Sequence, residues 1–151
     1  MNIESIIGRR LSKAQACEAN KELEKIRRKH GRVTQKRVVD WARPKSNLLH
    51  KHFEWNQSAA AERYRLEQAR FLIHEVRIVV TVPKNAKPYT TRAWVSTVDK
   101  FGRSYIPMVE AMTNKATRNQ LLAEAYQAME HLVRKYRELK ELAPVFAAIE
   151  R

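Results

Sequence analysis

The sequence predicts an α+β fold that is dominated by helices. Three stretches carry apolar residues at the three-to-four spacing of an amphipathic helix, and one stretch between them alternates with the period of two of a β-strand. With three glycines and five prolines in 151 residues, the chain is poor in the tight turns of a β-rich fold. We therefore expect an N-terminal helical hairpin, a long central helix, a small antiparallel β meander and a long C-terminal helix.

Capping residues mark the first two helices. Ser12 begins a capping box, and Gly31 supplies a stop at the C-terminal end of the first helix. Thr34 is then a good N-cap for a short helix over residues 35–42. A helix, a short turn that contains glycine and a second, short helix follow one another with the spacing of a helix-turn-helix. Any αα-hairpin has the same pattern.

Two longer helices follow. Asn56 or Ser58 caps the central helix, which we expect to run to about Val76. Thr117 caps the last helix, whose apolar spacing continues to Ala143. Each of these two helices has an apolar stripe, and we expect the two stripes to cover each other within one chain: Leu66, Ala69, Ile73 and Val76 against Leu122, Ala125, Met129, Leu132, Tyr136 and Leu139.

The segment between these helices has the pattern of strands. Residues 76–82 are rich in β-branched side chains, and residues 91–98 alternate cleanly between apolar and polar. The loop 84–89 joins them, and a turn before residues 104–108 precedes a short edge strand. We place a domain boundary between a basic N-terminal helical hairpin, 1–44, and an α+β body, 45–151, although one continuous domain is also compatible with the sequence.

The net charge of +14 is concentrated near the N-terminus. Residues 1–57 hold 14 basic and 6 acidic side chains, and the stretch 25–37 holds seven Lys or Arg and no acid. Such a cluster is either a solvated face or a surface for a polyanion, and release of counterions from a phosphate backbone favours the second interpretation. The predicted nucleic-acid contacts are Lys21, Lys25, Arg27, Arg28, Lys29, Arg32, Gln35, Lys36, Arg37 and Arg43.

The pattern of His50, His52 and Glu54 is the one group of metal-ligating residue types in close spacing. The alternative, which we prefer, is a connector in which the His rings pack with Phe53 and a buried Trp55 onto the central helix. We predict no metal site, no cofactor and no catalytic residue, because no nucleophile motif or glycine-rich phosphate loop is present. The protein is thus predicted not to be an enzyme.

The chain has no secretory signal pattern and no apolar run long enough for a bilayer, and Cys17 is its single cysteine. We therefore expect a soluble protein without disulfides or membrane partners.

Two segments resemble a group of small phage and prophage proteins. They are Leu49-His50-Lys51-His52-Phe53-Glu54-Trp55 and the stretch 60–73, which contains AAERYR and QARFLI. The resemblance covers about residues 33–151, and the chain departs from the group at Asn47-Leu48-Leu49, where Ser-Pro-Leu is usual. It implies a viral origin, with the host cytoplasm or the virion as location, and a structural role for the aromatic connector. It transfers no catalytic residue.

The sequence therefore predicts a phage-type, non-enzymatic DNA-binding protein that contacts mostly the phosphate backbone. One alternative is a virion structural or assembly protein whose basic face contacts packaged genome or an acidic capsid or portal surface. Another is an inhibitor that binds an acidic groove of a host factor. Oligomerisation is compatible with all three.

Overall fold

The computed structural model describes residues 2–81 and 87–150, which form two compact units, Met1–Ala111 and Met112–Arg151. Six α-helices and two small antiparallel sheets in this part of the chain confirm the helix-dominated α+β class. The predicted boundary at residue 44 does not coincide with the division into units, since residues 1–44 belong to the same unit as the central helix. Among the described residues, no helix combines the length and apolarity needed to cross a bilayer.

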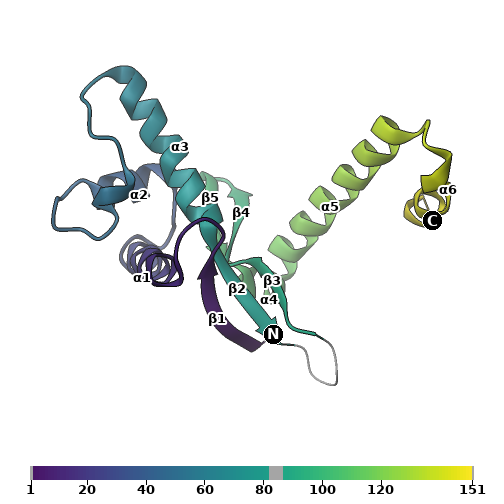
Figure 1. Ribbon diagram of the computed structural model, residues 1–151, viewed down its shortest axis with the longest axis horizontal. Coiled ribbons are helices and arrows are strands. Elements are labelled where there is room, and N and C mark those ends of the chain that lie inside the picture. Colours follow the sequence, from purple (N-terminus) through teal and green to yellow (C-terminus); the bar gives the residue numbers. More distant parts are fainter. Residues whose placement is uncertain (1, 82–86, 151) are drawn as a thin grey trace. The chain divides into compact units, whose positions relative to one another are not determined.

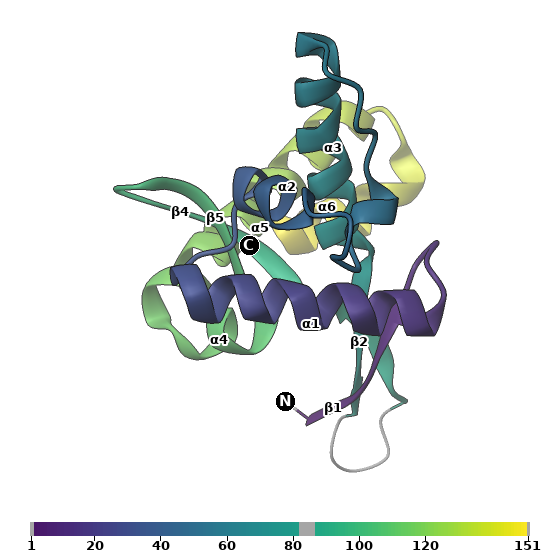
Figure 2. The ribbon, with the colours of Figure 1, turned by 90° about the vertical axis from the view of Figure 1, so that its left-hand side faces the viewer.

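The first unit contains the three-stranded sheet. This first sheet has the order β1 (Asn2–Gly8), β2 (Val76–Thr81), β3 (Tyr89–Arg92), with both pairs antiparallel (Figure 1). Strand β1 was not predicted from the sequence. Alternate residues of β2 are buried, and α1 (Lys13–His30) packs against β1 and β2 with its apolar stripe. The helix crosses the strands, as Figure 2 shows.

The first three helices begin at the predicted caps. Ser12 closes its capping box, Thr34 caps α2 (Gln35–Ala42), and Ser58 caps α3 (Ala59–Glu75). Helix α2 packs more extensively against α3 than against α1. Both helices of the predicted hairpin are therefore present, while the paired geometry of a helix-turn-helix stays a prediction.

The predicted strand 91–98 is in fact two strands in two sheets. Residues 89–92 form β3, whereas β4 (Trp94–Asp99) pairs with β5 (Gly102–Pro107) in a separate hairpin. The chain divides at Ala93, whose N–H donates to the Val76 carbonyl at 3.1 Å and whose carbonyl accepts from Met108 at 2.8 Å. The single three-stranded meander was wrong for this reason. Residues 82–86, which hold part of the predicted loop, lie outside the described residues.

The short helix α4 (Met108–Thr113) follows β5, and the second unit is then almost entirely helical. Its main element, α5 (Lys115–Tyr136), begins two residues before Thr117 because Asn114 is the cap. It ends seven residues before Ala143, and a short 3-10 turn (Lys140–Leu142) leads into α6 (Ala143–Ile149). Within this unit α6 contacts α5, and Val133 and Phe146 are the buried apolar side chains among its described residues.

The α3 stripe that was predicted to cover the α5 stripe is filled within the first unit. Ala69, Ile73 and Val76 have no exposed surface, because the first unit buries them. The α5 stripe, by contrast, is 42% exposed at Leu122 and 42% at Leu132. The α3 stripe is therefore not available as the partner that was predicted for α5.

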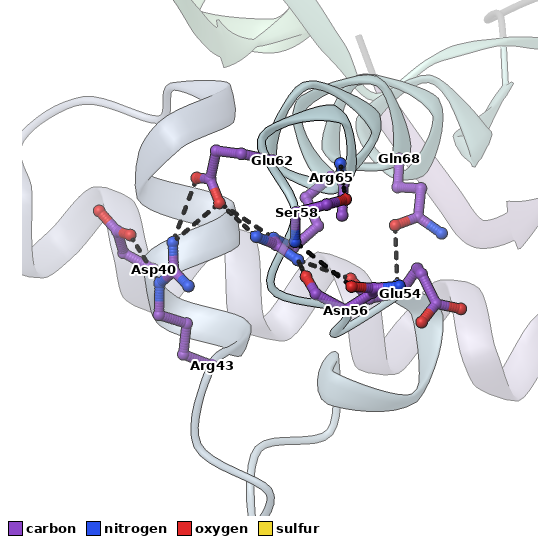
Figure 3. Close-up of polar contacts among 9 residues, drawn as sticks. Asp40, Arg43, Glu54, Asn56, Ser58, Glu62, Arg65 and Gln68 are labelled. Atoms are coloured by element: carbon purple, nitrogen blue, oxygen red, sulfur yellow. Dashed lines mark hydrogen bonds and ion pairs between the residues drawn. The ribbon is translucent and has the colours of Figure 1, made fainter.

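A buried arginine fixes the connector between α2 and α3 (Figure 3). The Arg65 guanidinium, 5% exposed, donates to the Glu54 and Asn56 carbonyls at 3.0 and 2.7 Å. It also donates to the Glu62 carboxylate at 3.1 and 2.5 Å, and Glu62 in turn accepts from Arg43 at the end of α2 at 3.2 Å. Hydrogen bonds from Arg65 lower the pKa of Glu62. The network therefore ties α2 and the connector to α3.

Trp55 packs at the edge of this network. Its indole N–H donates to the His50 carbonyl at 2.9 Å, its ring stacks on His50 at 4.7 Å, and the Arg65 guanidinium lies 5.5 Å from its centroid. The ring is only half-buried, so the expectation of a buried Trp55 was wrong. The His50 and Phe53 rings contact Trp55 as predicted, whereas the contact with the Arg65 guanidinium was not predicted.

Replacement of the buried arginine should destabilise the first unit. We expect Arg65→Ala to lower the free energy of unfolding by roughly 2–4 kcal/mol, because two carbonyls and a carboxylate lose their donor. Arg63→Ala, two residues earlier and exposed, is the matched control and should change it by less than about 0.5 kcal/mol. Urea denaturation followed by circular dichroism measures both. Equal effects would show that the network contributes nothing specific.

Candidate nucleic-acid interface

The turn between α1 and α2 is joined to the β4–β5 hairpin. Gly31 ends α1 with a φ of 73°, a left-handed conformation that glycine adopts without strain. The Tyr105 N–H donates to the Val33 carbonyl at 2.8 Å, and the Arg32 guanidinium donates to Asp99 at 3.0 Å and to the Gly102 carbonyl at 2.9 Å. These bonds place the hairpin beside the first turn of α2.

Two adjoining hollows lie along this junction, and Thr34 and Lys36 line both of them. The first has a volume of about 470 Å³, and its other lining residues are His30, Arg32, Arg37, Asp40 and Phe101. The second has a volume of about 280 Å³, and its other lining residues are Gln35, Leu66, Arg103 and Tyr105. We call these two hollows together the basic cleft, because Asp40 is the one acid among their lining residues.

An exposed aromatic ring stands at the edge of the basic cleft. Phe101, in the turn of the β4–β5 hairpin, is 72% exposed. The Arg32 guanidinium lies 5.5 Å from its centroid and the Lys100 ammonium 5.0 Å. A large apolar ring between two cations has the two features that bind nucleic acids, a face for bases or sugars and charges for phosphates.

Six of the ten predicted contact residues have an ion pair or a hydrogen bond to a distant group inside the protein. Lys25 pairs with Glu22, Arg27 with Glu110 and Arg32 with Asp99. Arg37 donates to the carbonyls of His30 and Arg32. Arg43 pairs with Asp40 and Glu62. Gln35 donates to the Tyr105 hydroxyl at 3.4 Å. These side chains shape the surface rather than extend freely from it.

The other four predicted residues have no ion pair within the described part of the chain. They are Lys21, Arg28, Lys29 and Lys36, and all four are exposed. Arg28 makes one long hydrogen bond, to the Glu24 carbonyl of its own helix at 3.5 Å. Lys21, Lys25, Arg28 and Arg32 recur at helical spacing along α1 and the turn that follows it, so this row of cations ends at the basic cleft. Lys29 lies 5.3 Å from the Trp41 ring on α2.

The contribution of the hairpin was not predicted from the sequence. Lys100, Phe101 and Arg103 are 63 or more residues beyond Arg37 in the sequence, and the pairing of Tyr105 with Val33, with the bonds of Arg32 and Gln35 to the hairpin, brings them to α2. An aromatic residue near Lys100 and Arg103 in a predicted turn indicates a possible nucleic-acid contact. The sequence of the turn does not indicate which other segment of the chain the turn lies beside.

A second group of arginines lies on the first sheet and the end of α3, beside His74. Arg77 and Arg92 are direct cross-strand partners, and Arg70 and His74 are on the last turns of α3. Loss of hydration, followed by the charges of Arg70, Arg92 and Arg77, lowers the pKa of His74 below its ordinary value of 6.5. Like charges in direct register repel each other, so this group adds to the positive field of the first unit.

A buried carboxylate supports the floor of the interface. Glu22 is 3% exposed and accepts hydrogen bonds from Lys25 at 2.5 Å, from the Trp41 indole at 2.7 Å and from Asn47 at 3.2 Å. Burial alone would raise its pKa, but these donors outweigh burial and hold the pKa of Glu22 below its ordinary value of 4.5. Glu22 therefore orients Trp41, the ring over which Lys29 lies.

The three residues considered as metal ligands are not gathered around one point. The Nδ1 atom of His50 contacts the Ala42 carbonyl at 2.9 Å, and its ring stacks on Trp55. Burial, with the charge of Lys51, lowers the pKa of His52 below its ordinary value. Within the described residues, no group of three or more His, Cys, Asp or Glu is arranged to bind a metal ion.

No protein-family model, curated protein or solved structure matches this chain. The function must therefore be argued from the geometry and charge of the basic cleft.

The Glu22 network should make stability depend on pH. A carboxylate whose pKa is lower in the folded than in the unfolded state stabilises the fold above about pH 4.5, and this contribution is lost as the pH falls through the folded pKa. We expect Glu22→Gln to lower the free energy of unfolding by about 1–2 kcal/mol at pH 7, because a neutral amide accepts these bonds less well. The difference from the original protein should shrink at pH 3.

Urea denaturation at both pH values measures that difference, with Glu24→Gln in the same helix as the matched control. A difference that is equal at pH 7 and pH 3 would contradict the assigned role of the Glu22 charge.

Proposed function

We propose that this protein is a non-enzymatic, phage-type DNA-binding protein that contacts the phosphate backbone of duplex DNA through the basic cleft. The observation that carries the proposal is the convergence of the α1 cation row, the first turn of α2 and the β4–β5 hairpin on one hollowed surface. The host cytoplasm or the virion, where DNA is present, is the location that we propose.

The charge balance supports a polyanionic ligand. The unit that contains the basic cleft holds 23 Lys or Arg and 11 Asp or Glu, whereas the second unit holds 7 and 5. The two acids nearest the basic cleft, Asp40 and Asp99, are already paired with Arg43 and Arg32. The exposed ammonium and guanidinium groups that remain repel one another, and contact with phosphates would relieve this repulsion and release counterions.

Backbone contact is better supported than reading of base edges. In the predicted recognition helix, Gln35 is engaged with Tyr105, Arg37 with two backbone carbonyls and Asp40 with Arg43. Of the described side chains in that turn, Lys36 is the one exposed cation that has neither a hydrogen bond nor an ion pair. Several free donors and acceptors are needed to discriminate base pairs in the major groove, so we expect weak sequence preference.

The exposed ring of Phe101 adds an apolar contact to these charges. A protruding aromatic side chain next to cations can stack on a base or sugar, or wedge between base pairs from the minor groove. The ring is 72% exposed in the free protein, and exposure of this apolar surface to water is unfavourable. A contact with a base or sugar would cover it.

A second candidate function is that of a virion structural or assembly protein. The observation that favours it is the uncovered apolar stripe of α5, which suits a contact between protein chains. In that case the basic cleft would contact packaged genome. Mass spectrometry of purified particles tests this function, since a structural component is present in many copies.

Removal of the free cations should weaken binding while the fold is retained. The variant combines Lys21→Ala, Arg28→Ala, Lys29→Ala and Lys36→Ala, and it leaves Arg32 and Arg37 in place because they hold the hairpin and the end of α1. We expect weaker binding to a labelled random-sequence duplex, with a log–log salt slope that falls by about 0.9 for each phosphate that the variant no longer neutralises. Fluorescence anisotropy at several salt concentrations measures both.

The matched control removes the same charge from exposed positions that do not line the basic cleft: Lys45, Arg63, Arg134 and Lys140, each to Ala. It should retain nearly the original slope. Equal weakening in the two variants would mean that net charge, and not the basic cleft, determines binding.

The Phe101→Ala variant should separate apolar contact from charge. We expect its Kd for duplex to rise about tenfold, since stacking of one base is worth about 1–3 kcal/mol, while the salt slope stays unchanged because no charge is removed. Val98→Ala, 51% exposed on the same hairpin, is the control and should bind normally. An unaltered Kd for Phe101→Ala would exclude the ring from the interface.

A further inference from the structure

The second unit has an apolar stripe that nothing within that unit covers. Side chains at the first and fourth positions of successive heptads are 42% exposed at Leu122, 43% at Met129, 42% at Leu132 and 39% at Tyr136. Helix α6 contacts a different side of α5, where Val133 is buried. The stripe has the 3.5-residue period with which two helices pair along a coiled-coil seam.

The α3 stripe, which the sequence suggested as the partner of the α5 stripe, is not available for this contact. The stripe of α3 is filled inside the first unit, as the complete burial of Ala69 and Ile73 shows. We propose that the α5 stripe binds the α5 stripe of a second copy of this chain, in an antiparallel two-helix seam that makes the protein a dimer.

The antiparallel direction follows from the sizes and charges along the stripe. In an antiparallel pair centred between Met129 and Leu132, those two residues face each other across the seam, and the small Ala125 faces the large Tyr136 of the other copy. A parallel pair in register would instead set Ala125 against Ala125 and Tyr136 against Tyr136, which leaves a gap at one level and crowding at the other.

Charge supports the same direction. Lys115 and Arg118 continue the heptad pattern at the N-terminal end of α5. A parallel pair would therefore bring each of these cations beside the same residue of the other chain, where the two positive charges repel. In the antiparallel pair these cations lie at opposite ends of the seam, and the two helix dipoles also oppose each other favourably.

The exposed area is sufficient for a stable contact. The 22 residues of α5 form a helix about 33 Å long. Two copies that covered their stripes on each other would remove roughly 1,000 Å² from water, the size at which specific interfaces begin. Because the contact uses the same surface on both chains, it closes as a symmetric dimer.

Light scattering coupled to size exclusion, with the full chain over a range of concentrations, tests the dimer. We expect the original protein to be a dimer and Leu132→Asp to weaken the dimer about 100-fold, since the charge would face Met129 of the other copy. Gln127→Asp, exposed on another side of α5, is the matched control and should remain a dimer. A monomer at every concentration for the original protein, or a dimer of Leu132→Asp as tight as the original, would overturn the proposal.

Circular dichroism of Leu132→Asp should be unchanged, because the side chain is 42% exposed within one chain. Unfolding of this variant as a monomer would mean that the stripe belongs to the chain's own core, and would likewise overturn the proposal.

Disulfide cross-linking tests the direction of the seam. In a chain with Cys17→Ser, the double variant Ala125→Cys and Tyr136→Cys should form a covalent dimer on mild oxidation, while each single variant should not. The two positions are about 16 Å apart along one helix, too far for a bond within one chain. Covalent dimers of the single variants would indicate a parallel seam and overturn the antiparallel assignment.

Discussion

The hydrogen bond from the Tyr105 N–H to the Val33 carbonyl joins two segments that are 72 residues apart, and the candidate interface depends on it. Val33 is completely buried and Tyr105 is 3% exposed, so the bond lies in the interior, where loss of either partner leaves an unpaired polar group. It brings the β4–β5 hairpin to the first turn of α2. Together with the bonds from Arg32 to Asp99 and to the Gly102 carbonyl, it keeps Phe101 beside the cations of α1 and α2.

The arginines of this protein divide into those that hold the structure and those that remain free. Arg65 is buried and satisfied by two carbonyls and a carboxylate, and Arg32 and Arg37 bond to carbonyls that a turn and a helix end leave without partners. A guanidinium suits this task because its donors are fixed in a plane and its charge is lost only at extreme pH. The free cations are mostly lysines, with flexible stems that can follow a phosphate backbone. A basic cluster in a sequence therefore overstates the number of charges available to a ligand.

The two units pose different problems of burial. The first unit covers the apolar faces of α1, α3 and β2 by its own packing, whereas α5 has only the short α6 against it within the second unit. A helix of 22 residues with one uncovered apolar stripe needs a further surface, and a seam between two copies supplies it. A dimer would carry two basic clefts, and simultaneous contact of both with one DNA molecule would raise the avidity for long duplexes.

The sequence by itself determined most of the local structure. Ser12, Gly31, Thr34 and Ser58 begin or end helices because caps act on the backbone of their own turn, and that chemistry is visible in a few neighbouring residues. The strand β2 and the hairpin turn at Gly102 followed from the same local patterns. Along the last helix the local signal was ambiguous, since Asn114 and Thr117 are both good caps and only one is used.

Tertiary structure decided everything that depends on a distant partner. β1 is a strand only because β2 offers it an edge, and residues 89–99 divide at Ala93 because Val76 and Met108 both bond to it. The pairing of α3 with α5 could not be judged from two matching stripes, since periodicity shows that a face is apolar and not what covers it. The basic residues of α1 and α2 were identifiable from charge alone. Their division into paired and free cations, and the addition of Lys100, Phe101 and Arg103, required the fold, because hydrogen bonds and ion pairs form between groups that are close in space, wherever they lie in the sequence.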